Sequence, residues 1–361
     1  MMNNVKTKPD TLLDRPVGNG WFNGIRGKFY GNNILVLITF ALLIAIYAAA
    51  SIVFRKEHFG SLNGIFSMIN SYPHLVVIAA GMTMVLISGN IDISVGGQCA
   101  MYCMMLAYFM QSNGHNVNAY VMILIVLITG MVFGLVQGVL VAYFKVQPFI
   151  VTLVGMFFAR GMVAMISTDP IAITNPDFRA LQQIKLTLPF GGYTDAGGQY
   201  QTPFIFLYSI LALLTVLVVY AVMTWSTFGR SVYAVGGSQQ SAVLMGLKPK
   251  RVTLIVFIFQ GLLTAFGSTL FCLQAPGGSV EKVMGFEMNA IAAAVIGGAL
   301  LTGGVGNILG SLAGTLMQTM IFKAVVPLKL SDGWGAILTA IMMAIFLAMQ
   351  AVLNLRRRKH E

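Results

Sequence analysis

Three ionisable side chains fall within or beside apolar stretches of this chain. Asp92 lies in the glycine-rich segment 89–97 between two apolar runs, Arg160 lies near the middle of another run, and Glu287 lies where a further run begins. A charge in apolar surroundings is costly unless it is capped, paired or hydrated, so each is a candidate functional group. Two structural alternatives stay open. Asp92 or Ser94 could cap the next helix, and Arg160 and Glu287 could each be held in an ion pair.

The chain lacks the patterns that an enzyme would need. It has no glycine-rich phosphate loop ending in Lys-Ser or Lys-Thr, so it is not expected to bind ATP itself. No metal-binding set, Ser-His-Asp pattern or catalytic pair of carboxylates stands out, and the four histidines, His74 among them, are scattered and expected to be idle. Cys99, Cys103 and Cys272 lie in apolar runs as packing thiols. We therefore expect no catalytic residue, metal or cofactor.

The composition shows that lipid surrounds most of the chain. Of 361 residues, 57% are hydrophobic and only 9% charged, with a mean hydropathy of +0.81. Soluble domains carry about a quarter charged residues, so this chain cannot cover a surface in water. The net charge of +11 resides in short segments between apolar runs, without a basic stripe interleaved with aromatics. This pattern indicates membrane topology and argues against nucleic-acid binding.

The apolar runs predict an all-α polytopic membrane protein with about ten transmembrane helices. A bilayer core of about 30 Å needs about 20 helical residues per span. The predicted spans are residues 33–53, 73–88, 93–110, 119–144, 149–167, 203–224, 252–273, 289–301, 308–326 and 334–355. Residues 1–32 would form a cytoplasmic segment, 33–355 the membrane domain and 356–361 a basic cytoplasmic tail.

Lysine and arginine placement orients these spans. With both termini cytoplasmic, fourteen Lys and Arg residues fall inside and seven outside, while Arg160 lies within a span. Cytoplasmic segments carry the excess of positive charge, which favours this orientation. The first thirty residues are polar, so we expect no cleavable signal peptide and a first helix that stays as an anchor.

Long polar segments and spaced glycines are the next features. Residues 168–202 would form the longest outside loop, residues 225–251 the longest inside loop, and loops of this length usually carry function. Two sets of glycines recur every four residues, a spacing that lets helices approach closely in lipid, either within one chain or across a dimer interface. They are Gly130, Gly134, Gly138, Gly306, Gly310 and Gly314. We expect packing within the chain.

A faint internal repeat also occurs. Residues 78–80 match residues 291–293 at an offset of 213 positions, and Gly97 matches Gly310 at the same offset. Each copy is a short apolar segment followed by a glycine-rich break, a pattern typical of transporter pathways.

Four motifs in order resemble those of the permease family of monosaccharide ABC importers, the ribose, galactose and xylose type within the branched-chain amino acid and sugar permease superfamily. Residues 89–96 read GNIDISVG, residues 147–161 QPFIVTLVGMFFARG, residues 228–247 FGRSVYAVGGSQQSAVLMGL, and residues 285–310 GFEMNAIAAAVIGGALLTGGVGNILG. The likeness extends over residues 62–353.

This chain departs from the family pattern at four positions. Asn90 stands in place of a glycine, Ser238 in place of an asparagine, Asn289 in place of an aspartate and Leu300 in place of a serine. Serine caps helices as well as asparagine does, whereas the last two changes leave the polar contacts there open.

The resemblance implies a permease subunit in a bacterial cytoplasmic (inner) membrane. Its partners would be an ABC ATPase subunit that binds the ATP, an extracytoplasmic sugar-binding protein and a second permease, either a copy or a paralogue. The inside loop would couple transport to the ATPase through a short helix at 239–245, preceded by a tight glycine turn. The coupling residues would be Gly229, Arg230, Gly236, Gly237, Ser238, Ala242 and Gly246. Candidates for the translocation path are Asp92, Ser94, Arg160, Glu287 and Asn289.

Two alternatives remain at this point. A permease of the same type could carry another small solute, such as a nucleoside or a branched-chain amino acid. A secondary transporter or channel is a different class, which needs an acid-rich or ion-coordinating core. Asp92 and Glu287, both near span ends, are the carboxylates associated with the predicted spans, and this argues against that class.

Overall fold

The computed structural model describes residues 20–54, 59–111, 117–189, 191–194, 200–281, 283–328 and 331–358. Most of the cytoplasmic segment predicted at 1–32, and the end of the tail predicted at 356–361, therefore lie outside the described residues. The helices are α1 (Gly20–Val53), α2 (Leu62–Ser71), α3 (Pro73–Ile87), α4 (Val95–Phe109), α5 (Ala119–Ala142), α6 (Pro148–Ile166), α7 (Pro176–Gln183), α8 (Leu207–Trp225), α9 (Thr227–Gly237), α10 (Gln239–Leu244), α11 (Pro249–Gln274), α12 (Phe286–Ile296), α13 (Ile308–Val325) and α14 (Asp332–Arg358).

The described helices make a membrane protein with six candidate spans, α5, α6, α8, α11, α13 and α14. A seventh arises if α2 and α3, which meet at a bend of 63°, count as one span. Every span predicted from the sequence overlies a helix, but α4 and α12 are shorter than a full crossing. In α1 the side chains are described from Leu37 to Val53, and that part is apolar. Helix α3, with 15 residues, is about 22 Å long, less than the bilayer core of about 30 Å. The count of ten is thus not established by helix length.

Two helix pairs are interrupted in the same way. Helices α3 and α4 are separated by residues 88–94, and α12 and α13 by residues 297–307. Helix α4 begins after Ser94 and α13 after Asn307, so these starts lie 213 positions apart, the offset of the sequence repeat. Gly89 and Gly298 adopt positive φ angles of 79° and 92° just after α3 and α12, which ends the helical path at both breaks. Gly303 and Gly304, at 85° and 74°, turn the connection between α12 and α13.

The region expected to be the outside loop is structured. Helix α7 begins where Asn175 accepts amide protons from Asp177 and Phe178, with Pro176 at its first position. Four short strands, β1 (Lys185–Thr187), β2 (Tyr193–Thr194), β3 (Tyr200–Gln201) and β4 (Phe204–Phe206), form two antiparallel pairs, β1 with β4 and β2 with β3. The described residues are therefore mostly helical, and the expectation that the chain is all-α is wrong in this region.

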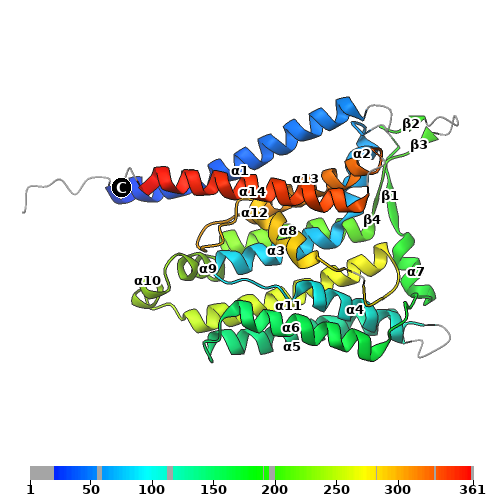
Figure 1. The fold of residues 1–361 in the computed structure, drawn as a ribbon, viewed down its shortest axis with the longest axis horizontal. Coiled ribbons are helices and arrows are strands. Elements are labelled where there is room, and N and C mark those ends of the chain that lie inside the picture. Colours follow the sequence, from blue (N-terminus) through cyan, green and yellow to red (C-terminus); the bar gives the residue numbers. More distant parts are fainter. Residues whose placement is uncertain are drawn as a thin grey trace, which may run out of the picture.

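The two ends of the molecule differ. Helices α9 and α10 lie at one end, on the left in Figure 1, where α14 also ends and α1 begins. Helix α2, helix α7 and the strands lie at the opposite end (Figure 1). Helix α1 begins at Gly20, thirteen residues before the predicted start of the first span.

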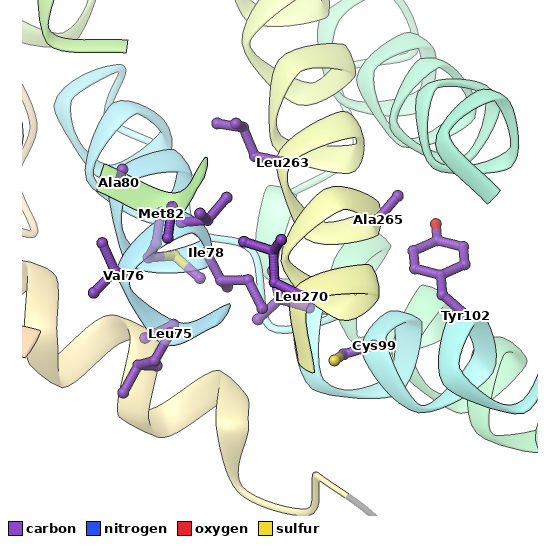
Figure 2. Close-up of a cluster of buried hydrophobic side chains, with 14 of the residues drawn as sticks. Leu75, Val76, Ile78, Ala80, Met82, Cys99, Tyr102, Leu263, Ala265 and Leu270 are labelled. Carbon is purple, nitrogen blue, oxygen red and sulfur yellow. The ribbon is translucent and has the colours of Figure 1, made fainter. Parts of the chain in front are cut away.

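Helix α11 is central to the core. Figure 2 shows Leu263 and Leu270 of α11 on the side that faces Ile78 of α3, and Ala265 on the opposite side. These four side chains are 0–6% exposed, and they belong to one large apolar cluster. A helix that is apolar on several faces is expected to be buried among others, as α11 is here.

Candidate functional site

Asp92 anchors a chain of buried polar side chains. Its Oδ1 accepts hydrogen bonds from the backbone N–H of Ser94 at 2.8 Å and from the Ser94 hydroxyl at 2.5 Å. Gln98 and Gln137 each donate a side-chain N–H to Ser94 Oγ, at 2.6 and 2.9 Å, and the Tyr102 hydroxyl donates to Gln98 Oε1 at 3.1 Å. Gln137 belongs to α5, so Ser94 links the break to a neighbouring helix.

The burial of Asp92 and Ser94 shows whether they line the translocation path or support the backbone. Asp92 and Ser94 have no exposed surface, so in this structure they do not line an open path. Asp92 instead fixes the backbone just before α4. Ser94 occupies the N-cap position, but its side chain accepts no amide proton of α4. Of the two caps that the sequence left open, Asp92 or Ser94, the Ser94 hydroxyl therefore does not cap this helix, because it is bonded to Asp92 and to the two glutamines.

Arg160 and Glu287 come together across two elements. Arg160 Nη2 of α6 lies 3.9 Å from Glu287 Oε1 in the first turn of α12, with side chains 21% and 12% exposed. A Cβ built on Gly96 of α4 would lie 1.8 Å from Glu287 Oε2, so the glycine makes room for the carboxylate. Asn289, two residues further along α12, is half-buried. The sequence marked both charges, but nothing in it showed that they are partners or that Gly96 matters.

His74 was expected to be idle, and this expectation is wrong. It is the second residue of α3 and is fully buried. Its ring stacks on Phe286 with centroids 4.9 Å apart and meets the edge of Phe271 at 4.6 Å. The cluster joins the starts of α3 and α12 to the end of α11, next to Glu287. It closes this end of the bundle with aromatic packing.

Helices α9 and α10 form the element expected to couple with a partner. Ser238 separates them, and its hydroxyl accepts the N–H of Ser241 at 3.2 Å, which caps α10. Gly246, at φ +79°, follows the end of α10. Ala242 is buried, while Leu244 at 89% exposed projects an apolar side chain away from the protein.

The glycines before α10 do not form the expected turn. Gly236 and Gly237 are the last residues of α9, and neither has a positive φ. Gly237 has open space around it, whereas a Cβ on Gly236 would lie 1.8 Å from the carbonyl oxygen of Ile87. The tight-turn prediction is wrong because the helix continues through both residues. Gly236 is needed for close approach instead.

The start of α9 is fixed by its neighbours. A Cβ on Gly229 would lie 2.2 Å from the carbonyl oxygen of Met223, so this glycine lets α9 fold back on the end of α8. Arg230 is exposed and donates to the carbonyl of Trp225 at 3.2 Å. Arg230 thus stabilises the turn between α8 and α9.

A cavity of about 770 Å³ opens beside these helices. Its lining combines Asn90 from the break after α3, Lys145 and Gln147 from the connection between α5 and α6, Gln239 from α10 and Lys250 from α11. Among the described residues, the lining contains two lysines and no carboxylate. Sequence reasoning gave no sign of this cavity, because its walls come from five helices and from connecting segments that lie far apart in the sequence.

The spaced glycines pack against helices of the same chain. A Cβ on Gly130, Gly134 or Gly138 of α5 would come as close as 2.2–3.0 Å to atoms of α11. Gly310 and Gly314 of α13 lie similarly close to the carbonyls of Gly297 and Ala293 at the end of α12. Gly306 precedes α13 and contacts Ile87 instead, so its assignment to the same helix stripe is wrong.

Comparisons with known proteins agree with these features. The chain matches the family described as "Branched-chain amino acid transport system / permease component" over residues 64–347. It is 33% identical to the inner membrane ABC transporter permease protein YjfF of Escherichia coli, over 88% of this chain and 92% of that protein. It is 31% identical to the fructose import permease protein FruG of Bifidobacterium longum, over 80% and 83%. It is 30% identical to the ribose import permease protein RbsC of Escherichia coli, over 86% and 90%.

No solved structure matches the chain. The family match covers well over half of the residues, including both broken helix pairs and the segment from α9 to α11. Such permease components carry no ATPase activity, which accords with the missing phosphate loop. The chain therefore belongs to this family of permease components of ABC transporters.

Proposed function

We propose that the chain is the permease subunit of an ATP-driven monosaccharide importer in a bacterial inner membrane. The main support for this proposal is the set of relatives that are named as fructose, ribose and galactose import permeases. The chain aligns with each of them over most of its length. An extracytoplasmic binding protein would deliver the sugar, and a separate ABC ATPase subunit would supply the energy.

The proposed topology places α9, α10 and both termini in the cytoplasm, with ten membrane-crossing elements. Figure 1 supports it, since α14 ends and α1 begins at the end of the molecule that holds α9 and α10. The short helices α3, α4 and α12 would complete their crossings through the irregular breaks. Such breaks are tolerated at membrane depth where they are buried in protein, as Asp92 and Ser94 are.

Helix α10 is the proposed contact with the ATPase. Leu244 at 89%, Met245 at 65% and Val243 at 56% exposed form an apolar tip at the end that would face the cytoplasm. An exposed apolar cluster of this kind is typical of an interaction surface. Gly229 and Arg230 hold the start of α9, Gly236 lets its last turn pack against Ile87, and Ser238, Ala242 and Gly246 hold the start, body and end of α10. Gly237, which has open space around it, is assigned no part in this contact.

The Arg160–Glu287 pair, with Asn289, is the proposed contribution of this chain to the sugar path. The two side chains are partly exposed where α6 meets the start of α12, and charges at membrane depth are stabilised when protein or water covers them. A second permease, either a copy or a paralogue, would cover this face and leave a polar path between the two subunits. Asp92 and Ser94 would support the path from behind.

The solute class is tested by substrate competition in membrane vesicles that contain the permease with its ATPase and binding protein. Labelled ribose, galactose, fructose, leucine and a nucleoside are each offered alone, and each labelled sugar is also competed with unlabelled leucine and with the unlabelled nucleoside. We expect one sugar to be transported and its uptake to be unaffected by the other two classes. Uptake of leucine or of the nucleoside instead would assign the chain to another solute, in line with the amino acid transport named in the family description.

A further inference from the structure

Three separate segments of the chain meet at the end of α9. They are the turn after α3 at Gly89, the last turn of α9 at Gly236, and the connection between α12 and α13 at Gly303 and Gly304. A Cβ on Gly303 would lie 2.7 Å from the carbonyl oxygen of Gly236 and 2.8 Å from Cα of Gly89. A Cβ on Gly304 would lie 2.6 Å from Cα of Gly237. The three segments therefore touch backbone to backbone.

A hydrogen bond joins the two broken helix pairs at this point. The backbone N–H of Gly304, after α12, donates to the carbonyl of Ile87, the last residue of α3, at 2.8 Å. Both atoms of this bond face Gly236. A Cβ on Gly236 would lie 1.8 Å from Ile87 O and 2.8 Å from Gly304 N. The end of α9 thus packs directly against the hydrogen bond that connects the two broken helix pairs, α3–α4 and α12–α13.

A second contact holds α9 in the same place. The Tyr233 hydroxyl donates to the carbonyl of Gly306 at 2.9 Å, on the connection that leads into α13. Tyr233 precedes Gly236 by three residues, so both lie on one face of α9. This face contacts the break after α3 and the break after α12 at once, and α10 follows it after the single residue Ser238.

The geometry of these contacts restricts how the segments can move. Backbone groups in van der Waals contact have no side chains between them that could change rotamer and absorb a displacement. Movement of α10 is therefore passed through the end of α9 to both breaks rather than lost in a flexible loop. The breaks lie at equivalent positions of the internal repeat, since Ser94 and Asn307 precede α4 and α13 at the same offset.

We propose that the last turn of α9, centred on Gly236, positions both broken helix pairs and moves them together when α10 moves. Gly236 is a positioning residue, which contacts neither the solute nor ATP. The proposal rests on the proposed function, in which α10 binds the ATPase. It adds that a movement of α10 displaces α3 and the connection between α12 and α13 together, through the contacts at Gly236.

The test compares two adjacent alanine substitutions in the importer reconstituted with its ATPase and binding protein. Gly236→Ala places a methyl group against the backbone of Ile87 and Gly304, which belong to the two broken helix pairs. Gly237→Ala places the methyl group in open space and has the same effect on helix propensity. Sugar uptake, ATP hydrolysis, the amount of assembled complex and its thermal stability are measured together.

We expect Gly236→Ala to lower the sugar moved per ATP hydrolysed by about tenfold, since couplings between sites typically span about 5- to 150-fold. Gly237→Ala should stay within about twofold of the unmodified importer, as substitutions in open surroundings usually do. Equal sugar-to-ATP ratios for the two variants would overturn the proposal. Failure of the unmodified importer to take up sugar with ATP would instead refute the proposed function.

A milder variant covers the case in which Gly236→Ala does not accumulate in the membrane. Tyr233→Phe removes the hydroxyl that binds Gly306 and adds no atom, so the chain should fold and assemble normally. We expect the sugar moved per ATP to fall by a few-fold, with unchanged assembly and thermal stability. An unchanged ratio in Tyr233→Phe would contradict the proposal even if Gly236→Ala cannot be studied.

Discussion

Replacing Ser94 with alanine removes a hydroxyl that three side chains share. In the structure this oxygen donates to Asp92 at 2.5 Å and accepts from Gln98 at 2.6 Å and Gln137 at 2.9 Å. The substitution leaves two amide donors and one carboxylate oxygen without that partner in a region with no exposed surface. Buried polar groups that lose their partners are destabilising, and the effect here should be one of stability.

The size of the effect follows from the number of bonds lost. Side-chain hydrogen bonds in membrane proteins contribute about 0.6 kcal/mol on average, and those in soluble proteins about 1 kcal/mol. Three such bonds correspond to about 2–3 kcal/mol, or roughly a 30- to 150-fold change in the ratio of folded to unfolded protein. Ser209→Ala is the matched control, because Ser209 is equally buried and its hydroxyl has no hydrogen-bond partner among the described residues.

The three native cysteines provide the assay. Cys99, Cys103 and Cys272 are free and fully buried, so a thiol-reactive fluorescent dye reacts with them only as the protein opens. Cys99 lies next to Gln98 and therefore reports on the region that the substitution disturbs. The detergent-purified Ser94→Ala variant should react at a clearly lower temperature than the unmodified chain, and Ser209→Ala at nearly the same temperature. Identical unfolding of the two variants would refute the structural role of the Ser94 hydroxyl.

Three further predictions concern ATP, the partner surface and the ion pair. The isolated chain should show no ATP binding, because it has no phosphate loop, and saturable binding of labelled ATP in detergent would contradict this. Leu244→Glu places a charge on the apolar tip of α10 and should abolish co-purification of the ATPase at unchanged membrane abundance. Lys185→Gln, on the exposed strand β1 at the opposite end of the molecule, should retain it. Arg160→Met should lower thermal stability because it leaves the Glu287 carboxylate without its cation, and adding Glu287→Gln should restore most of the loss. Equal stability of the single and double variants would show that the pair is not coupled.

The sequence predicted those parts of the fold that depend on local pattern. Each apolar run became a helix, and the helix at α10 lies where Ser238 and Gly246 were expected to begin and end it. These features follow from hydrophobic length, capping and glycine conformation, which act within a few residues. The helix at α7 had the same kind of local signal in Asn175 and Pro176, which was overlooked inside a polar segment.

The features that sequence reasoning missed depend on contacts between distant segments. Gly236 and Gly237 are identical in the sequence, yet one is pressed against Ile87 and the other faces open space. His74 looked like an end residue until Phe286, more than two hundred positions later, was found stacked on it. Such roles are set by which helices pack together, and a single sequence without that packing does not distinguish them.

The central claim is tested most directly by measuring sugar uptake into proteoliposomes from which one component at a time is left out. The complete system contains the permease, its ATPase with enclosed ATP, and the binding protein loaded with sugar outside. We predict uptake in the complete system and none when the ATP, the ATPase or the binding protein is omitted. Uptake that persists without ATP and follows an imposed proton or sodium gradient would contradict the account and identify the chain as a secondary transporter.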